Sequence, residues 1–288
     1  MTTGVAERSP RVPAPLLVLA AASSVQFGAA LAATLFHRLG PGGASLLRVG
    51  LGAVILVVAW RPRIRGVPAA DLRLAATLGL VLGGMNFAFY EALARVPLGI
   101  AVTIEFAGPL GVAVALSRRR LDIVWIVLAA GGIVLLADRG HGSLDPTGLV
   151  LVLVAAACWA AYILLAERAG RRFTGGNGLA LAMIVATLVP LGPGLAQGGS
   201  QLLVPGLLAQ GLAVALLSSV IPYSLEMESL RRMPREVFGV LMSLEPALAA
   251  LAGFVVLHQH LSGRDVLAIA LVIAASVGAT RARPAIDG

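Results

Sequence analysis

The stretch from residue 173 to residue 225 reads FTGGNGLALAMIVATLVPLGPGLAQGGSQLLVPGLLAQGLAVALLSSVIPYSL and contains no charged side chain. Water would not tolerate so long an apolar segment, whereas a bilayer core accepts helices of roughly 20 mainly apolar residues. The rest of the chain is similar: of its 288 residues, 58% are hydrophobic and 12% are charged, against about 25% charged in soluble domains. We therefore expect an integral membrane protein.

Apolar runs separated by arginines and by proline or glycine breaks predict an all-α integral membrane protein with ten transmembrane helices. Strands are excluded, because these runs are about twice as long as a barrel strand and do not alternate strictly. The run from Val12 to Phe36 is too long for a signal-peptide core, so we expect it to be retained as the first helix. The glycine-rich stretch from Pro190 to Pro205 predicts the turn between helices seven and eight. The ten predicted spans are 15–36, 44–60, 71–93, 98–117, 121–137, 147–167, 178–195, 205–229, 235–257 and 263–281.

All 22 basic residues of the chain are arginines, and their positions test this division. Cytoplasmic loops of membrane proteins are enriched in positive charge. With the N-terminus inside, the external segments hold only Arg38, Arg95, Arg139 and Arg264, and Arg48 falls within the second span. The 17 cytoplasmic arginines are Arg8, Arg11, Arg61, Arg63, Arg65, Arg73, Arg118, Arg119, Arg120, Arg168, Arg171, Arg172, Arg231, Arg232, Arg235, Arg281 and Arg283. The asymmetry predicts that both tails, 1–14 and 282–288, are cytoplasmic.

The two halves of the chain share a sequence pattern. ALARVP at 92–97 is followed twelve residues after its proline by Pro109, and SLRRMP at 229–234 is followed at the same spacing by Pro246. Both pairs of prolines are 137 residues apart. We expect two five-helix repeats, 15–137 and 147–281, joined by an external connector at 138–146. Because five is odd, the second repeat enters the membrane inverted, as in many secondary transporters, whose substrate site lies near the midplane.

Several motifs are distributed between residues 15 and 281. They are GGMN at 83–86, FY at 89–90, PLGIAV at 97–102, EF at 105–106, GPL at 108–110, CWA at 158–160, YIL at 162–164, PYSLEM at 222–227, FG at 238–239, LMS at 241–243 and EPALAA at 245–250. Together they resemble the EamA-type branch of the drug/metabolite transporter superfamily, and within it the bacterial inner-membrane threonine/homoserine exporters. The resemblance implies a ten-helix basket of two inverted repeats that exports amino acids.

The chain departs from that family at one place. Members usually continue the ninth helix into a Leu-Gly-Glu turn, whereas this chain has Leu257, His258, Gln259 and His260. The expected carboxylate is missing. If that acid gates the external mouth or handles protons elsewhere in the family, this protein must do so differently.

Acids inside predicted spans are candidate transport residues, because each costs roughly 2.5–3.5 kcal/mol at a helix centre. Glu245 lies directly before Pro246, which frees a backbone carbonyl one turn earlier. It could bind a substrate ammonium group or a proton, or lock the two halves by a hydrogen bond. Glu105, four residues before Pro109, is predicted to line the cavity. Glu226 could bind substrate arriving from inside or pair with an arginine.

Other polar and aromatic side chains at spanning positions complete the predicted site. Tyr90 has an alternative place in the interfacial belt of the membrane. The predicted substrate-binding residues are Gln26, Asn86, Tyr90, Glu105, Trp159, Tyr162, Tyr223, Glu226, Ser243 and Glu245. The predicted hinge or kink residues are Pro97, Pro109, Pro222 and Pro246.

Charged residues near helix ends have structural interpretations. Glu91 and Glu228 each precede an arginine by four residues, Arg95 and Arg232, so we expect an ion pair on one helix face. Arg48 could hold a substrate carboxylate through a bidentate contact. We expect it instead to extend to the lipid headgroups or to form a structural pair.

We expect a secondary exporter of small amino acids or related metabolites in the bacterial inner membrane, working by alternating access with possible proton coupling. A passive channel-like facilitator is the alternative, and a membrane-embedded enzyme is a weaker one. No glycine-rich nucleotide loop is present, and the histidines, at 37, 141, 258 and 260, lie in predicted external loops. We expect no cofactor, metal site or nucleic-acid partner, and a monomer or weak oligomer. Cys158 and the glycines at 79–84 and 108–111 are assigned to packing.

Overall fold

The computed structural model describes residues 12–115, 122–137, 145–230, 232–233 and 235–281, and every regular element among them is a helix. The first half contains α1 (Ala14–Thr34), α2 (Phe36–Trp60), α3 (Ala69–Leu93), α4 (Leu98–Glu105), α5 (Ala107–Ala115) and α6 (Asp122–Ala137). The second half contains α7 (Pro146–Arg172), α8 (Asn177–Gly198), the 3-10 helix η1 (Gly199–Leu203), α9 (Pro205–Ala215), the π-helical turn η2 (Leu216–Val220), α10 (Ile221–Leu230), α11 (Arg235–Met242), α12 (Glu245–Leu257) and α13 (Gly263–Arg281). The all-α prediction is confirmed for the described residues. Most of the predicted tails and connector lies outside them.

Length and composition suit several of these helices to a bilayer. Large apolar side chains face outward, for example Val58, which is 65% exposed, and Leu203, which is 77% exposed. Lipid covers such surface at no cost, whereas water does not. The six described helices that are long and apolar enough to span are Ala14–Thr34, Phe36–Trp60, Ala69–Leu93, Pro146–Arg172, Asn177–Leu203 and Val237–Leu257. Shorter apolar helices are Leu98–Val112, Ile123–Leu136 and Pro205–Val220. The chain is a helical, multi-pass membrane protein.

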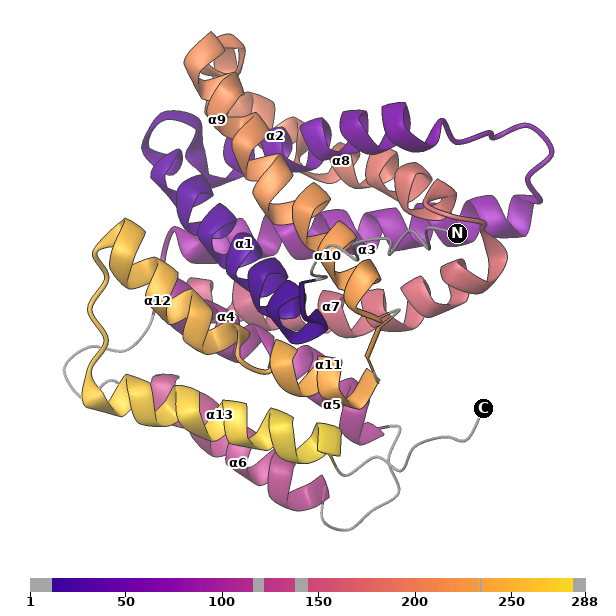
Figure 1. Ribbon diagram of the computed structural model, residues 1–288. Coiled ribbons are helices and arrows are strands. Elements are labelled where there is room, and N and C mark those ends of the chain that lie inside the picture. The colour runs from indigo at the N-terminus through magenta and orange to yellow at the C-terminus, as the bar shows by residue number, and fades with distance from the viewer. Residues whose placement is uncertain (1–11, 116–121, 138–144, 231, 234, 282–288) are drawn as a thin grey trace, which may run out of the picture.

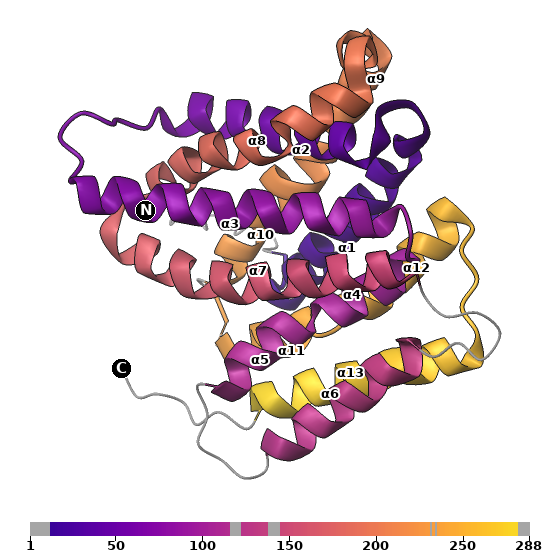
Figure 2. The ribbon, with the colours of Figure 1, turned by 180° about the vertical axis from the view of Figure 1, so that it is seen from behind.

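The two halves of the chain pack into one body. Figure 1 and the opposite view in Figure 2 show α2, α3, α7 and α8 side by side, with α6 and α13 paired at the other edge. Between these layers, α1 contacts α10 and α12, and α12 contacts α4. Nearly all of these contacts join a helix of the first half to a helix of the second. The interior is therefore shared by the two halves.

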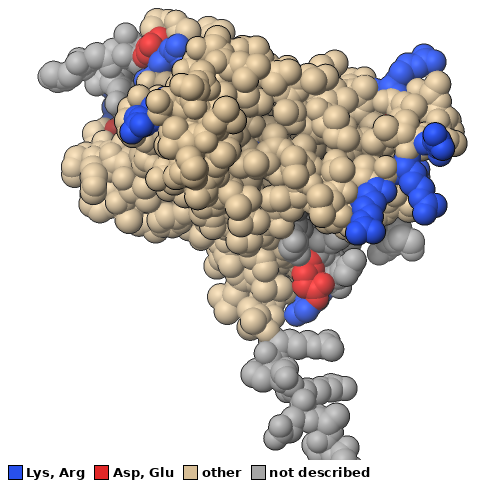
Figure 3. Space-filling model, turned by 90° about the horizontal axis from the view of Figure 1, so that it is seen from above, with Lys and Arg blue, Asp and Glu red and all other residues tan. Residues whose placement is uncertain are grey.

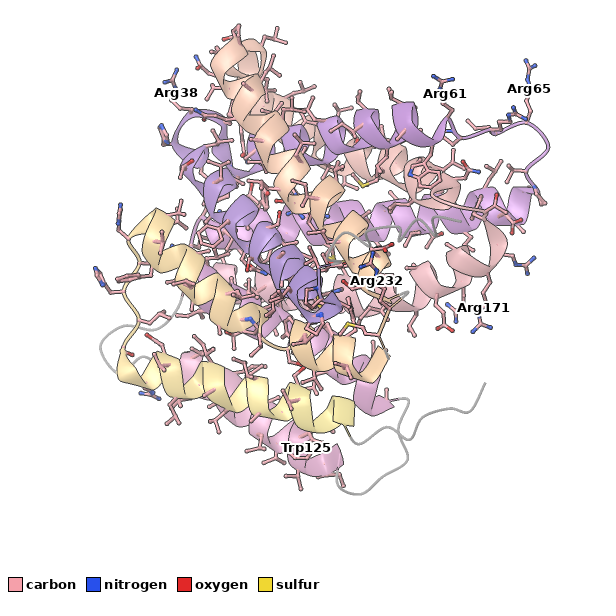
Figure 4. All side chains as sticks on the ribbon, in the orientation of Figure 1. Arg38, Arg61, Arg65, Trp125, Arg171 and Arg232 are labelled. Carbon is pink, nitrogen blue, oxygen red and sulfur yellow. The ribbon has the colours of Figure 1, made fainter. Side chains whose placement is uncertain are left out.

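Charge is concentrated at the ends of the long helices. Figure 3 shows a broad uncharged surface with arginines gathered toward its edges. In Figure 4, Arg61, Arg65 and Arg171 lie at one end of the helices and Arg38 lies at the opposite end. A wide apolar band between two charged rims is the surface that a bilayer requires.

Two predicted spans are interrupted near their middle at positions related by the 137-residue offset. α4 and α11 each have eight residues, and both follow a proline of the repeated sequence pattern. The helices resume as α5 and α12, shortly before Pro109 and Pro246. A proline cannot donate to the carbonyl four residues earlier, so the carbonyls of Glu105 and Met242 lose their helical donors. Interruptions thus occur beside two predicted hinges, while motion at them stays a prediction.

The turn predicted between Pro190 and Pro205 is shorter than expected. α8 continues through Pro190 and Pro193 to Gly198, and only η1 and Val204 separate it from α9. Membrane helices tolerate proline, because neighbouring groups satisfy the carbonyls that it frees. The predicted spans 178–195 and 205–229 agree with the end of α8 to within a few residues and with the start of α9 at Pro205.

α2 begins at Phe36, earlier than the predicted span 44–60, and contains a kink. Gly40 has φ of 65° and is followed by Pro41; glycine adopts this left-handed conformation without a steric penalty. The Gln197 side chain of α8 packs against the kink, and its Oε1 accepts a hydrogen bond from the Gly42 amide at 2.7 Å. The start of α2 is thereby held against the end of α8.

Close helix packing confirms the interpretation of some glycines and not of others. A Cβ on Gly83 of α3 would lie 2.5 Å from the Ala186 carbonyl oxygen of α8. A Cβ on Gly108 of α5 would lie even closer to the Ala156 carbonyl oxygen of α7. By contrast, a Cβ on Gly111 would meet no atom within 4 Å. Glycine permits the close approach of α3 to α8 and of α5 to α7. Only the tertiary structure identifies which of the predicted glycines lie at these contacts.

Replacing Gly83 with alanine is expected to destabilise the protein by about 1–3 kcal/mol, because the new methyl group forces α3 and α8 apart. The adjacent Gly84→Ala is the control, since its Cβ would meet the Cys158 Sγ at an ordinary 3.7 Å. Thermal unfolding of the two purified variants in detergent makes the comparison. Equal stability of the two variants would contradict the close α3–α8 contact.

Candidate transport site

Glu245 lies in a group of buried or half-buried polar side chains contributed by four helices. It is the first residue of α12, and Pro246 is the second. Proline is tolerated in the first turn of a helix, because the amides there have no carbonyl partner within the helix. Glu245 is 5% exposed, and its Oε2 accepts a hydrogen bond of 3.3 Å from Nε2 of Gln26 on α1. Glu105 of α4 and Glu226 of α10 both interact electrostatically with it. The structure brings these four predicted residues together.

Arg48 of α2 enters the same interior, so of the two expectations for it, extension to the headgroups is wrong and structural pairing remains. Its guanidinium donates to the Tyr90 hydroxyl at 3.3 Å and to the Ser218 carbonyl at 3.4 Å. It also lies 5.4 Å from the centre of the Tyr90 ring, within the range of a cation–π contact. Its charge interacts with Glu105 across the interior. The sequence showed an arginine in a span but not the direction of its side chain.

The π-helical turn η2 explains why polar side chains gather beside Pro222. In this turn the Ile221 amide bonds to the Leu216 carbonyl, five residues earlier. Pro222 has no amide hydrogen to donate. The Leu217 carbonyl, five residues earlier, therefore lacks the donor of a π-helix, and the Ser218 carbonyl, four residues earlier, lacks the donor of an α-helix. Ser24 Oγ donates to the Leu217 carbonyl at 2.7 Å, and Arg48 donates to that of Ser218. π-turns inside helices occur often at functional sites.

Tyr90 is fully buried, which excludes the interfacial position considered for it. Its ring contacts Phe36, with 5.7 Å between ring centroids, and lies beside the Arg48 guanidinium. Asn86, one turn earlier on α3, is also buried, but its Nδ2 donates to the Leu82 carbonyl of its own helix at 2.8 Å. Tyr90 therefore joins the polar interior, whereas Asn86 is bound locally.

The remaining predicted residues make other contacts or have no described side chain. Ser243, at the α11–α12 interruption, shares a hydrogen bond of 2.7 Å with Ser276 of α13 and also donates to its own helix. Trp159 of α7 packs edge-to-face against Phe106, with 5.2 Å between ring centroids. Tyr162 is half-buried in apolar packing between α7 and its neighbours. The Tyr223 side chain lies outside the described part.

The two predicted ion pairs are present. Arg95 NH1 lies 3.0 Å from Glu91 Oε2, and Arg232 pairs with Glu228. An interaction that the sequence did not indicate is the hydrogen bond of 2.9 Å from Gln197 Nε2 to Glu91 Oε1. Glu91 therefore helps to join α3 to α8 at the end of the bundle that holds Arg38.

Two other features offer nothing to an ionic substrate. An open groove of about 410 Å³ between α5 and α7 is lined by alanine, glycine, valine and leucine, including Val112 and Leu164. Within the described part of the chain, which omits His141, no three His, Cys, Asp or Glu side chains are placed to hold a metal ion. The features of the interior that can bind an ionic substrate are therefore the glutamates and Arg48.

Comparisons with known proteins show what this chain is similar to. It is 46% identical over 268 residues to the threonine/homoserine exporter RhtA of Salmonella typhimurium (strain LT2), across 92% of this chain and 90% of that protein. The RhtA of Escherichia coli (strain K12) is 44% identical with the same coverage. Residues 146–281 match the EamA-like transporter family. The chain belongs to the EamA-like transporter family.

More distant similarity agrees with this membership. The uncharacterized inner membrane transporter YedA of Escherichia coli (strain K12) is 28% identical over 227 residues, covering 73% of this chain and 71% of that protein. A solved structure titled only "Crystal structure of protein" has a TM-score of 0.59 at 20% identity, covering 93% of this chain and 97% of the other, and so shares the fold. The family predicted from the sequence motifs is confirmed. An EamA-like protein is a transporter, so the enzyme alternative is set aside.

Gln259, which replaces the carboxylate expected in the family, has a structural partner in this EamA-like transporter. Its Oε1 accepts a hydrogen bond of 2.9 Å from the Leu98 amide, at the first turn of α4. First-turn amides have no partner within their own helix, so the amide oxygen of Gln259 performs the capping that a carboxylate oxygen would. His258 adopts a left-handed conformation, φ 53°, which ends α12 and directs the chain toward α4.

Gln259→Ala is expected to lower stability by about 1 kcal/mol, because the Leu98 amide loses its acceptor. Gln259→Glu should retain most of the stability, since a carboxylate oxygen can accept the same bond. Thermal unfolding in detergent measures both, with Gln201→Ala as control, because Gln201 accepts from Arg38 on the exposed surface. If Gln259→Ala proves no less stable than Gln201→Ala, the Leu98 contact contributes nothing.

Proposed function

We propose that this EamA-like transporter is a secondary active exporter of small amino acids such as threonine and homoserine. It works by alternating access in the bacterial inner membrane, as a monomer or weak oligomer. The observation that carries the proposal is an interior polar group, in which Gln26, Glu105 and Glu245 are buried and Arg48 and Glu226 are half-buried, beside helix interruptions. The substrate class comes from relatives at 44% and 46% identity, which are named threonine/homoserine exporters. The membrane comes from the relative named an inner membrane transporter.

The buried glutamates suit an amino-acid substrate. Several carboxylates brought together at low dielectric are stable only when a cation or a proton accompanies them. A substrate ammonium group supplies that cation at Glu245 and Glu105, while Glu226 of α10 receives it on its way from the cytoplasm. The remaining predicted residues, Asn86, Tyr90, Trp159, Tyr162, Tyr223 and Ser243, complete the proposed cavity lining.

The proposed architecture is ten spans in two inverted repeats, 15–137 and 147–281. Three observations support it. α4 and α11 have the same length and are related by the offset of the repeated prolines. The family match covers 146–281, almost the same as the second repeat. Arginines lie at both ends of the long helices, as Figure 4 shows. With ten spans and the more arginine-rich side inside, both tails are cytoplasmic.

Cysteine labelling tests this topology. Cys158 is the only cysteine of the chain, so Cys158→Ala provides a cysteine-free background. In intact cells, a membrane-impermeant maleimide should label Ser143→Cys in the connector, but neither Ser9→Cys nor Ala285→Cys in the tails. Permeabilised cells should give labelling at all three positions. Labelling of one tail only in intact cells would exclude an even number of spans.

Alternating access requires flexible points within the spans, and Pro97, Pro109, Pro222 and Pro246 are the proposed hinges. Pro97 caps the start of α4, and the other three lie directly after or within interrupted helices. Rotation at these points would move the glutamates relative to Arg48 without unfolding a helix. A proton that replaces the substrate on Glu245 or Glu105 during the return step would couple export to the pH gradient.

Wild-type protein in liposomes is expected to exchange labelled threonine with saturating kinetics and counterflow, and to transport faster under an imposed pH gradient. Glu245→Gln, which cannot ionise, should transport at least tenfold more slowly and lose the response to the gradient, as expected when a proton-transferring group is removed. Initial rates with and without the gradient give both quantities.

Glu167→Gln is the matched control, because Glu167 pairs with Arg171 on the exposed end of α7. It should behave as wild type. A wild-type rate that rises linearly with threonine concentration and shows no counterflow would indicate a passive facilitator. A saturable rate that ignores the pH gradient would remove proton coupling while leaving amino-acid transport in place.

A further inference from the structure

Arg48 is a cation in the interior without a close anionic partner. Among the described residues, no carboxylate comes within ion-pairing distance of its guanidinium. Its two hydrogen bonds, to the Tyr90 hydroxyl and the Ser218 carbonyl, are 3.3 and 3.4 Å long, beyond the usual range for N–H···O bonds. A guanidinium carries five N–H donors. Most of the donor capacity of Arg48 is therefore available to a ligand.

Two further donors stand beside this arginine. The Tyr90 hydroxyl accepts from Arg48, so its own proton can be donated elsewhere. The Ser218 hydroxyl is buried, lies close enough to the Tyr90 hydroxyl to interact with it, and makes no well-formed hydrogen bond in the described part of the chain. It belongs to the residue whose carbonyl Arg48 contacts. α2, α3 and η2 thus present a cation and two hydroxyl groups, the donor set that suits a carboxylate.

Acceptors make up the other part of the site. Gln26 uses its amide nitrogen on Glu245, while its Oε1 is buried without a partner among the described residues. The carboxylates of Glu245 and Glu105 add further acceptors, a set that suits an ammonium group. Glu105 connects the two parts, because it interacts electrostatically with both Arg48 and Glu245. Donors and acceptors therefore belong to one electrostatic neighbourhood.

We propose that Arg48, with the Tyr90 and Ser218 hydroxyls, binds the carboxylate of the substrate while Gln26, Glu245 and Glu105 bind its ammonium group. The inference rests on the proposed function and makes it more specific. The substrate must be an amino acid with both groups unblocked. An amine or amino alcohol of the same size leaves Arg48 unpaired, and a hydroxy acid leaves the glutamates unpaired, and each such loss is costly in a buried site.

The test is ligand binding to purified protein, measured as the shift of thermal unfolding over a range of ligand concentrations. The ligands are threonine, homoserine, threoninol, which has no carboxylate, and 3-hydroxybutyrate, which has no ammonium group. Wild type should bind threonine at least tenfold more tightly than either analogue. Arg48→Gln should weaken threonine binding about tenfold to hundredfold, the loss of a charge-assisted bond, and leave threoninol binding unchanged.

Two more variants separate binding from structure. Arg48→Lys keeps the charge but not the planar fork, so its preference for threonine over threoninol should be intermediate, which also serves if Arg48→Gln fails to fold. Arg171→Gln removes an exposed arginine of α7 that pairs with Glu167 and should match wild type. A purely structural Arg48 would change the stability of the unliganded protein without changing the preference between ligands.

The outcomes distinguish this inference from the proposed function. If wild type binds threoninol as tightly as threonine, or if both Arg48 variants keep the full preference, the carboxylate clamp is wrong while amino-acid transport stands. If wild type binds neither threonine nor homoserine, the proposed function and the clamp are both overturned.

Discussion

A carbonyl inside the hydrocarbon has no water available to it, so a proline that removes an amide donor from a spanning helix must be balanced by another polar group. Around Pro222 those groups are visible: the Ser24 hydroxyl bonds to the Leu217 carbonyl, and Arg48 bonds to the Ser218 carbonyl. This constraint draws polar side chains of α1 and α2 into the interior. The candidate site is assembled where the helices are interrupted.

The acidic residues of the site also lie at the helix interruptions. Glu105 ends α4 and Glu245 begins α12, so the carboxylates stand at the interruptions before Pro109 and Pro246. Three glutamates and one arginine in one neighbourhood leave an excess of potential negative charge. A transporter can use that excess, because an incoming cation or proton is stabilised there and its departure is costly unless another replaces it. The residues at the helix interruptions are thus the same residues that would bind the transported cation or proton.

Several features were predictable because they depend on local spacing. The apolar runs indicated spanning helices, the four-residue spacing of Glu91 and Arg95 indicated their ion pair, and the sequence motifs indicated the family. The glutamates beside prolines were identified as a site because a buried acid is expensive wherever it lies. The stretch from Pro190 to Pro205 overstated the length of the turn, because the cost of a proline depends on neighbouring helices that a sequence does not display.

From sequence alone came the membrane, the approximate spans and the acids of the candidate site, since hydrophobicity and the cost of burying charge are properties of individual residues. Tertiary structure alone decided that Arg48 faces Tyr90 and not the headgroups, that Ser24 and Ser218 belong to the interior, and that Gln259 caps α4. Those facts join residues 42 to 193 positions apart. Such contacts depend on which helices pack together, and packing is a property of the whole fold.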